Sequence, residues 1–452
     1  MRRYYTMTRS RRFCLALVCL SRIHIYAHSP DVTSHERNEK NVSSAILGTV
    51  NSNMVIWGWD RFIVQADWAK VGPTSWEKNL REGFEWDNSW FFTNQILHPY
   101  QGSMYFNSAR ENGLSFWESV PFSASGSLMW EYFLETGNPS INDLITTTLG
   151  GIALGESSYR LTELLLNYKG SGYKRVMAEA VSGLINPISG TYRLINGQIG
   201  TRSAMIHRPY YDIEIQNGIV MKTSEGYDTF KIPSLNLGAW IQYGNLHDST
   251  DTYMPYDYFN YSLSLNVNPD EPTGTIFMKA NIFGKSLYLA QQKRFVAGVF
   301  QHFDYIENFT YKYASNSLGV GIEGAFGSQG PLTLEYTAHL LGTALGVINS
   351  KITKKELGTD YSYGQGWGVK NSFAIKYKTL GRVSATYNKY YQYTLRGFDS
   401  YNTVDVASIS FDMFLTNIFQ FGVGAFHYVR ESDMGIDNHR SIGTRVYIIH
   451  KL

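Results

Sequence analysis

The chain has 452 residues, 43% of them apolar and 17% charged, so it is long enough for more than one core and too apolar to be disordered. Its 40 Lys and Arg against 38 Asp and Glu leave a net charge of +2, and no basic run lies outside the extreme N-terminus, which argues against a nucleic-acid partner. The 33 Tyr, 25 Phe and 41 Gly favour a transmembrane β-barrel, because such barrels carry aromatic girdles at both membrane interfaces.

Residues 1–29 have the pattern of an export signal, in which a basic stretch precedes the apolar run Phe13–Leu20 and small residues follow near Ala27. A disordered basic tail is the alternative interpretation. Both cysteines, Cys14 and Cys19, lie in this segment, so a mature chain would have no disulfide and no cysteine-ligated metal. The next residues, up to position 42, are expected to form a polar extension.

Residues 43–169 carry the signals of a helical domain. In three places a carboxylate follows a hydroxyl by three residues ahead of apolar sequence, which is the pattern of a capping box: Thr74–Glu77, Ser115–Glu118 and Ser140–Asp143. Gly151 and Gly155 lie one helical turn apart, so they predict a smooth helix surface that another backbone can approach closely.

After a connector expected at 170–200, hydrophobicity alternates with a period of two over 201–452. Phe259–Val267 is the clearest case, with apolar side chains on one face and Asn or Ser on the other. Similar runs predict about twelve antiparallel strands, an even number as in outer-membrane barrels. A soluble β-sandwich also alternates, but the Gly, Ser, Asn and charge on the polar face favour lipid outside and a polar lumen inside. The polar segments Lys351–Gly358 and Arg430–His439 are expected to be cell-surface loops.

The helical region holds polar residues in aromatic and small-residue surroundings. A carboxylate can orient and polarise an imidazole, so His98 with Glu131 is the candidate catalytic pair, His98 acting as general base. The structural alternative is that these residues only build the domain: Glu118 and Asp143 occupy capping-box positions, and Glu156 with Arg160 has the spacing of an ion pair within one helix. The wider polar cluster, binding or structural, comprises Tyr100, Tyr105, Asn107, Arg110, Glu118, Asp143, Glu156 and Arg160.

Several ordered motifs lie between Asn88 and Leu166. They are His98–Gly113, Phe116–Ser119, Gly126–Glu131, Pro139–Asp143 and Gly150–Glu156. Together they resemble an uncharacterised domain, of unknown function, in Bacteroides-type outer-membrane proteins. The resemblance implies a helical N-terminal part ahead of a barrel and assigns no reaction to any residue.

The sequence therefore predicts an α+β protein of the outer membrane, a barrel preceded by a small helical domain that plugs or docks on it. If the helices plug the barrel, their polar residues should pair with lumenal residues such as Glu323 and Arg382. The expected function is non-enzymatic, in transport, envelope organisation or an outer-membrane assembly, with membrane lipids and other envelope proteins as partners. The alternative is a membrane-embedded lipid or lipopolysaccharide hydrolase or acyltransferase that uses His98 and Glu131. No motif for a metal or another cofactor is found.

Overall fold

The computed structural model describes residues 40–203, 209–224, 233–246, 251–268, 272–290, 293–308, 310–327, 330–357, 359–378, 380–435 and 437–452. The predicted export signal, and all but the last residues of the polar extension, lie outside the described part of the chain.

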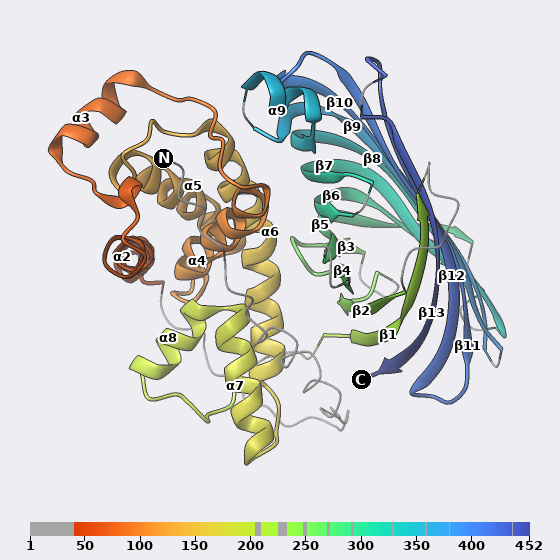
Figure 1. Cartoon of the computed structure of the whole chain (residues 1–452). Helices are drawn as coiled ribbons and strands as arrows, with labels where there is room; N and C mark the ends of the chain where they lie inside the picture. The colour runs from red at the N-terminus through yellow and green to blue at the C-terminus, as the bar shows by residue number, and fades with distance from the viewer. Residues whose placement is uncertain are drawn as a thin grey trace.

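The N-terminal half is helical up to residue 195 (Figure 1). Its elements are α2 (Val42–Gly58), the short η2 (Trp59–Val64) and η3 (Asp67–Ala69), α3 (Pro73–Glu82), η4 (Thr93–Leu97), α4 (His98–Arg110), α5 (Phe116–Phe133), α6 (Ile141–Leu166), α7 (Tyr173–Ile185) and α8 (Pro187–Ile195). The segment expected as a connector thus contains α7 and α8. We call residues 42–195 the helical domain.

Two of the three predicted helix starts are found where the sequence places them. The Ser115 side chain caps α5 in a capping box, with Glu118 Oε2 accepting from the Ser115 amide at 2.8 Å. Ser140 caps α6 by accepting from the Asp143 amide at 3.2 Å. The third is wrong by two residues: α3 follows the cap Gly72 with Pro73 in its first turn, because proline already has the backbone angle of a helix start.

The C-terminal half forms one antiparallel sheet. Its strands are β1 (Tyr211–Ser224), β2 (Ser234–Tyr243), β3 (Thr252–Tyr253), β4 (Phe259–Val267), β5 (Thr273–Ala290), β6 (Lys293–Glu307), β7 (Lys312–Phe326), β8 (Leu332–Asn349), β9 (Tyr361–Tyr377), β10 (Gly381–Arg396), β11 (Tyr401–Phe414), β12 (Phe419–Ser432) and β13 (His439–Lys451). Among these 13 strands of the described residues, β3 pairs only with β5. The other 12 close on themselves through the β1–β13 pair, which confirms the predicted barrel. One predicted surface loop holds a short helix, α9 (Lys351–Leu357).

The two faces of the barrel wall differ in which strands their side chains connect. Asp304 of β6 accepts hydrogen bonds from Lys370 Nζ of β9 at 2.6 Å and from the Tyr390 hydroxyl of β10 at 3.0 Å. Neither β9 nor β10 is a neighbour of β6 in the sheet, so these bonds cross the lumen. Residues of the opposite face, such as Val320 (60% exposed) and Ile409 (54% exposed), form the apolar outer wall. Lipid outside and a polar lumen are therefore the right assignment.

The expected pairing of Glu323 and Arg382 with helix residues is wrong. Lys279 Nζ lies 2.6 Å from Glu323 Oε1, and Arg382 Nη2 donates to Glu335 Oε2 at 2.9 Å. Both charges are satisfied inside the barrel, where each lies next to an opposite charge from another strand. The helices are on the other side of the wall.

The helical domain docks on the outer wall, with α6 nearest the strands (Figure 1). The Ser157 hydroxyl of α6 lies 2.6 Å from the Tyr261 hydroxyl of β4, and Gln301 Nε2 of β6 donates to the Leu149 carbonyl of α6 at 2.9 Å. Of the two arrangements expected, plugging or docking, the structure has docking. Aromatic side chains of the outer wall, such as Tyr243, Tyr261 and Tyr305, form much of the surface on which the helices dock.

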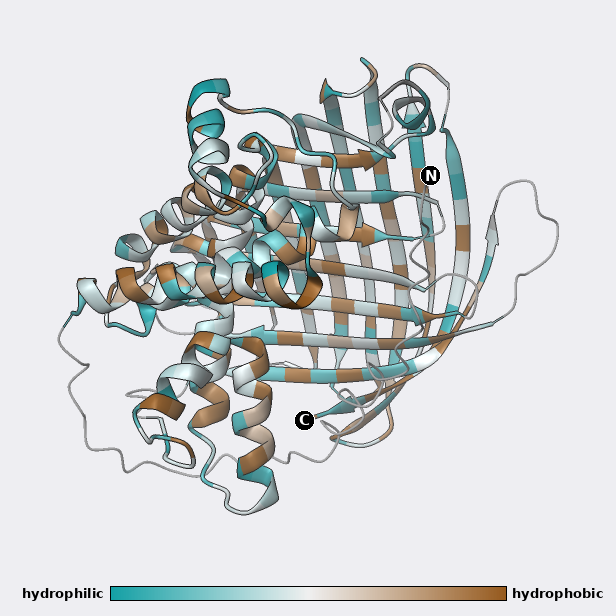
Figure 2. Cartoon of the chain, turned by 60° about the vertical axis from the view of Figure 1, so that its left-hand side comes forward, coloured by the Kyte–Doolittle hydropathy of each residue, from teal (hydrophilic) through white to brown (hydrophobic). Residues whose placement is uncertain are grey.

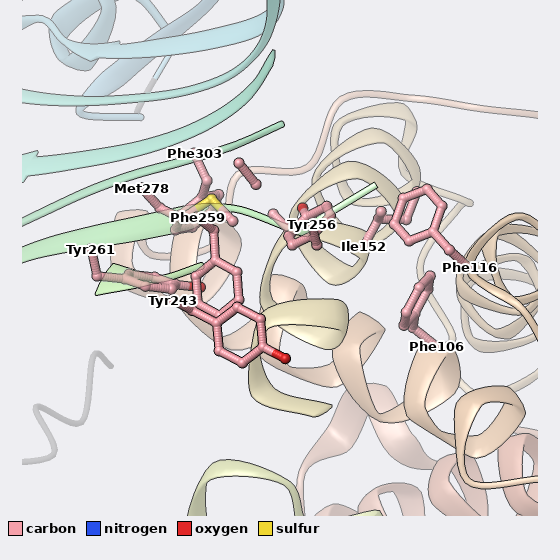
Figure 3. Close-up of a cluster of buried hydrophobic side chains, with 11 residues drawn as sticks. Phe106, Phe116, Ile152, Tyr243, Tyr256, Phe259, Tyr261, Met278 and Phe303 are labelled. Carbon is pink, nitrogen blue, oxygen red and sulfur yellow. The ribbon is translucent and has the colours of Figure 1, made fainter. Parts of the chain in front are cut away.

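α6 crosses the outer wall at a steep angle to the strands. Near its start, Ile145 packs in a buried cluster with Tyr361 and Tyr363 of β9. Near its end, Arg160 lies over the Tyr243 ring of β2, 5.7 Å from its centroid. A second buried cluster between the helices and the strands is shown in Figure 3 and comprises Phe106, Phe116, Ile152, Ala153, Tyr243, Tyr256, Phe259, Tyr261, Met278, Ala280 and Phe303. The two clusters join helices and barrel into one core.

Glycines allow α4 and α6 to approach closely, as Gly151 and Gly155 predict. A Cβ on Gly102 of α4 would lie 1.9 Å from the Thr147 carbonyl oxygen of α6. A Cβ on Gly151 would meet the Gly102 backbone at 2.6 Å. Such contacts are possible only between residues that lack a side chain.

Within the described residues no helix has both the length and the apolar character needed to cross a bilayer. Hydrophobic residues nevertheless occur along the outer helices as well as along the strands (Figure 2). A closed barrel with an apolar outer wall satisfies its backbone internally, and this architecture crosses outer membranes. The protein is an outer-membrane β-barrel protein.

Candidate functional site

Four carboxyl groups and one imidazole gather where α4, α5 and α6 meet. We call Asp87, His98, Glu131, Glu135 and Asp143 the carboxyl cluster. Glu131 Oε2 accepts from the Ser140 amide at 2.7 Å, and Asp143 Oδ1 accepts from Asn142 Nδ2 at 2.9 Å. The cluster thus sits at the N-terminus of α6, where backbone amides and the helix dipole favour negative charge.

The carboxylate nearest the His98 ring is Asp143, not Glu131. His98 Nε2 lies 3.8 Å from Asp143 Oδ1, beyond hydrogen-bond distance. Glu131 is instead engaged with the start of α6 through the Ser140 amide. The sequence suggested a pair of His98 and Glu131, whereas helix packing places Asp143 closest to the His98 ring among the carboxylates.

Burial sets the protonation of the carboxyl cluster. It raises the pKa of Asp143 to about 8, and the charge of Asp87 raises it further. Burial likewise raises the pKa of Glu135 to about 7 and that of Glu131 well above its usual range. Burial lowers the pKa of His98, although Glu135 and Asp87 act in the opposite direction. At neutral pH these shifts favour the neutral forms of Asp143, Glu131 and His98.

The carboxyl cluster contains the groups needed for proton transfer, but solvent and substrates have little access to them. His98 is 9% exposed and Asp143 is 3% exposed. Among the described residues no serine or threonine hydroxyl is hydrogen-bonded to the His98 ring, so no nucleophile is paired with it. Asp87 and Glu135 were missed from the sequence, because neither has a motif and only the packing brings them to His98.

A second predicted set forms a chain of charges that we call the Arg–Glu–Arg chain. Glu156 is fully buried between Arg110, whose Nε lies 2.7 Å from Oε2, and Arg160, whose Nε lies 2.8 Å from Oε1. Arg160 continues to the barrel, donating to the Pro255 carbonyl at 2.9 Å and lying 3.5 Å from Asp257. The ion pair expected from the Glu156–Arg160 spacing is present, and it links α4, α6 and the residues before β4.

The remaining predicted residues have separate places. Tyr100 donates to the Leu184 carbonyl at 2.7 Å, the buried Tyr105 donates to Asn53, and Asn107 Nδ2 donates to Ser158 Oγ at 3.0 Å. These three fasten helices to one another. Glu118 is exposed, where hydrogen bonds from Lys40 and from the Ser115 amide lower its pKa to about 2. It belongs to a helix cap and not to the buried groups.

A lumenal cluster of His302, Asp304, His339 and Lys370 was not predicted from the sequence. His302 Nε2 lies 2.9 Å from His339 Nδ1, and Lys370 Nζ contacts His302 Nδ1 at 3.2 Å as well as Asp304. His302 and Asp304 are two residues apart, so strand alternation could have placed them on one face. Their partners on β8 and β9 follow only from closure of the barrel. In the described part of the chain no group of three or more His, Cys, Asp and Glu residues is placed to hold a metal.

An aromatic layer crosses the lumen. The rings of Tyr313 on β7 and Tyr390 on β10 lie 4.8 Å apart, and these strands are not neighbours. The ring of Tyr311, which directly precedes β7, lies 6.1 Å from that of Tyr428 on β12. The layer comprises Ile306, Tyr311, Tyr313, Leu341, Ile348, Tyr390, Val404 and Val406, with Phe277 and Tyr428 packed against it. A lumenal cavity lined by Asn236, Ser264 and Arg445 amounts to about 30 Å³, room for about one or two water molecules.

The helical domain has relatives of unknown function. Residues 83–188 match the family model described as Domain of unknown function (DUF3943). This match contains the segment Asn88–Leu166 and confirms the resemblance to an uncharacterised domain, while a Bacteroides source stays a prediction. The DUF3943 segment includes both the carboxyl cluster and the Arg–Glu–Arg chain. No curated protein matches the chain in sequence.

The solved structures that match the chain include a porin, an outer membrane channel and an outer membrane phospholipase. The NanC porin has 8% identity, covers 52% of this chain and 100% of its own, and has a TM-score of 0.29. An outer membrane channel from Pseudomonas putida F1 has 5% identity, covers 54% and 94%, and scores 0.30. Outer membrane phospholipase A from Escherichia coli has 9% identity, covers 52% and 92%, and scores 0.26. Similarities this low identify no function.

Proposed function

We propose that this protein is a non-conducting, non-enzymatic barrel that holds the helical domain on its outer wall and acts in envelope organisation or in an outer-membrane assembly. The aromatic layer across the lumen is the observation that supports a non-conducting barrel. An open pathway for solutes would require these rings to move apart, and Tyr390 is held by a hydrogen bond to Asp304 at 3.0 Å. The helices cannot act as a gate inside the lumen, because they lie on the outer wall.

Conductance of the full-length protein in a planar lipid bilayer tests this proposal. We expect no stable conductance steps from the unmodified protein. The double variant Tyr313→Ala with Tyr390→Ala removes the central rings of the layer and should produce steps. Tyr387→Ala, on the same strand but exposed on the outer wall, is the matched control and should stay silent. Stable steps from the unmodified protein would refute the proposal.

The second candidate is a lipid or lipopolysaccharide hydrolase or acyltransferase, which the 3.8 Å approach of His98 to Asp143 favours. The burial of both groups argues against it. Lipid profiles of cells that carry His98→Ala or Glu131→Gln, compared with cells that carry the exposed Glu118→Gln, separate the two functions. A changed profile in the first two strains at normal protein levels would favour the enzyme, and three unchanged profiles favour the non-enzymatic barrel.

The proposed partners are membrane lipids and other envelope proteins. Affinity purification of the full chain from native membranes, followed by identification of proteins retained with it, tests for an assembly. Partners that are lost when the Arg–Glu–Arg chain is broken by Arg160→Met would depend on the docked helical domain. Recovery of the protein alone under mild detergents would favour an action through lipid.

A further inference from the structure

We propose that the face of α2 and η2 that points away from the barrel is embedded in membrane lipid, so that the helical domain lies in the bilayer beside the barrel without crossing it. We call this surface the α2 face. Its exposed apolar residues are Ile46, Leu47, Val55, Trp59, Phe62, Ile63 and Val64. The inference does not depend on whether the barrel conducts or whether the carboxyl cluster is catalytic.

The first observation is that α2 is inverted relative to a helix of a water-soluble domain. A soluble helix buries its apolar side chains and exposes its polar ones. α2 buries Thr49, Ser52 and Asn53 and exposes Val55 to 72%. Large exposed apolar patches mark contact with protein or membrane.

The second observation is that the inward polar groups of α2 are satisfied without water. Thr49 Oγ1 donates to the Ala45 carbonyl at 3.1 Å, and Ser52 Oγ donates to the Gly48 carbonyl at 2.8 Å. Asn53 Nδ2 donates to the Gly126 carbonyl of α5 at 3.1 Å. A helix in lipid must meet this requirement, because hydrocarbon offers no hydrogen-bond partner.

The third observation concerns charge and tryptophan. Between Val42 and Val64 the only charged residues are Asp60 and Arg61, both near the end of the segment. Trp57, Trp59 and Trp68 surround these charges in sequence. Tryptophan and charge together are typical of the boundary between hydrocarbon and headgroups, so this end of the α2 face is expected at that boundary.

The fourth observation is that the lipid-facing outer wall borders the helical domain, which favours lipid over a protein occupant. A cavity of about 220 Å³ is lined by Leu149 of α6 together with Leu318, Gly342 and Ala344 of the outer wall. Leu318 and the nearby Trp367 are exposed, so acyl chains that cover this wall reach the helical domain directly. Phe92, exposed on the helical domain, meets the outer-wall Tyr305 with ring centroids 6.4 Å apart. Lipid that surrounds the barrel therefore also borders the helices.

Depth-dependent fluorescence quenching of the full chain tests the inference. Cys14 and Cys19 are replaced by serine, a single cysteine is placed at Val55 or at Ile46, and an environment-sensitive dye is attached. The protein is reconstituted in vesicles of phosphatidylethanolamine and phosphatidylglycerol with or without doxyl-labelled lipid. Val320→Cys on the outer wall serves as the lipid reference and Glu77→Cys on α3 as the aqueous reference. Heat-modifiable gel migration shows which labelled variants are folded.

We expect lipid quenching at Val55 and Ile46 to equal that at Val320 within a factor of about two, with little quenching by aqueous iodide. Quenching by iodide as strong as at Glu77 would show that water covers the α2 face and would overturn the inference. Protection from both quenchers would show that protein covers it, either a second copy or a partner, and would also overturn the inference. Two positions are used so that one failed variant leaves the other decisive.

Discussion

Glu156 is the residue whose loss should damage the docked helical domain most. It is fully buried and compensates the charge of Arg110, which is itself buried, while Arg160 keeps partial access to water and the Pro255 carbonyl. Removing one partner of a buried ion pair costs about 3–5 kcal/mol, because the remaining charge is left uncompensated. Glu156→Gln keeps one hydrogen-bond acceptor, so we expect a cost near the lower limit, about 3 kcal/mol.

A barrel and a helical domain do not unfold in one step, so the assay must report on the helices alone. Amide hydrogen exchange of α6 in the folded, detergent-solubilised protein is suitable, because the exchange rate follows the free energy of local opening. A cost of about 3 kcal/mol corresponds to exchange that is roughly 100-fold faster. Glu118→Gln, which alters an exposed capping residue, is the control and should leave α6 exchange unchanged. Equal exchange in the unmodified protein and in Glu156→Gln would refute the reasoning.

Three further predictions concern the helical domain and its contact with the barrel. The pKa of Asp143 in the folded state is raised to about 8, so its contribution to stability is complete below the usual carboxyl pKa and is lost as pH rises through 8. Local opening of α6, measured by hydrogen exchange, should therefore increase from pH 5 to pH 8, and should increase less in Asp143→Asn. Greater stability of α6 at pH 8 than at pH 5 would contradict this prediction. Gly102→Ala forces a Cβ toward the Thr147 carbonyl and should cost about 1–3 kcal/mol of stability. The expected result is faster proteolysis of the helical domain. An unchanged rate would show that α4 and α6 can move apart to admit the methyl group without loss of stability. Tyr261→Phe removes one hydrogen bond to Ser157 and should cost about 1 kcal/mol by the same assay, and a loss of barrel heat-modifiability would be inconsistent with that local role.

The division into helices and barrel could be predicted because each half has its own hydrophobic period. The alternation in Phe259–Val267 gives β4 with the expected face outward, and the Ser115 capping box gives the start of α5. The Glu156–Arg160 pair follows from one helical turn of spacing. All of these are local signals, in which the interacting residues lie close in sequence.

The docking of the helices on the outer wall could not be predicted from such signals. Tyr261 and Leu265 share a face of β4, yet Tyr261 is buried under α6 whereas Leu265 is exposed. Alternation identifies the face and does not say what covers it. The approach of Asp143 to His98 likewise depends on the packing of α4 against α6. The sequence therefore supported a pair with Glu131 that the packing does not form.

The central claim is that the helical domain lies on the outer wall of a closed barrel, and that the lumen is filled by side chains of the barrel strands. Chemical crosslinking in native membranes tests it most directly. A chain with Ser157→Cys and Tyr261→Cys, whose native hydroxyls are 2.6 Å apart, should be crosslinked by a short bis-maleimide. A chain with Ser157→Cys and the lumenal Asn236→Cys should not be. Crosslinking of the second pair in place of the first would show that the helices enter the lumen and would contradict the account.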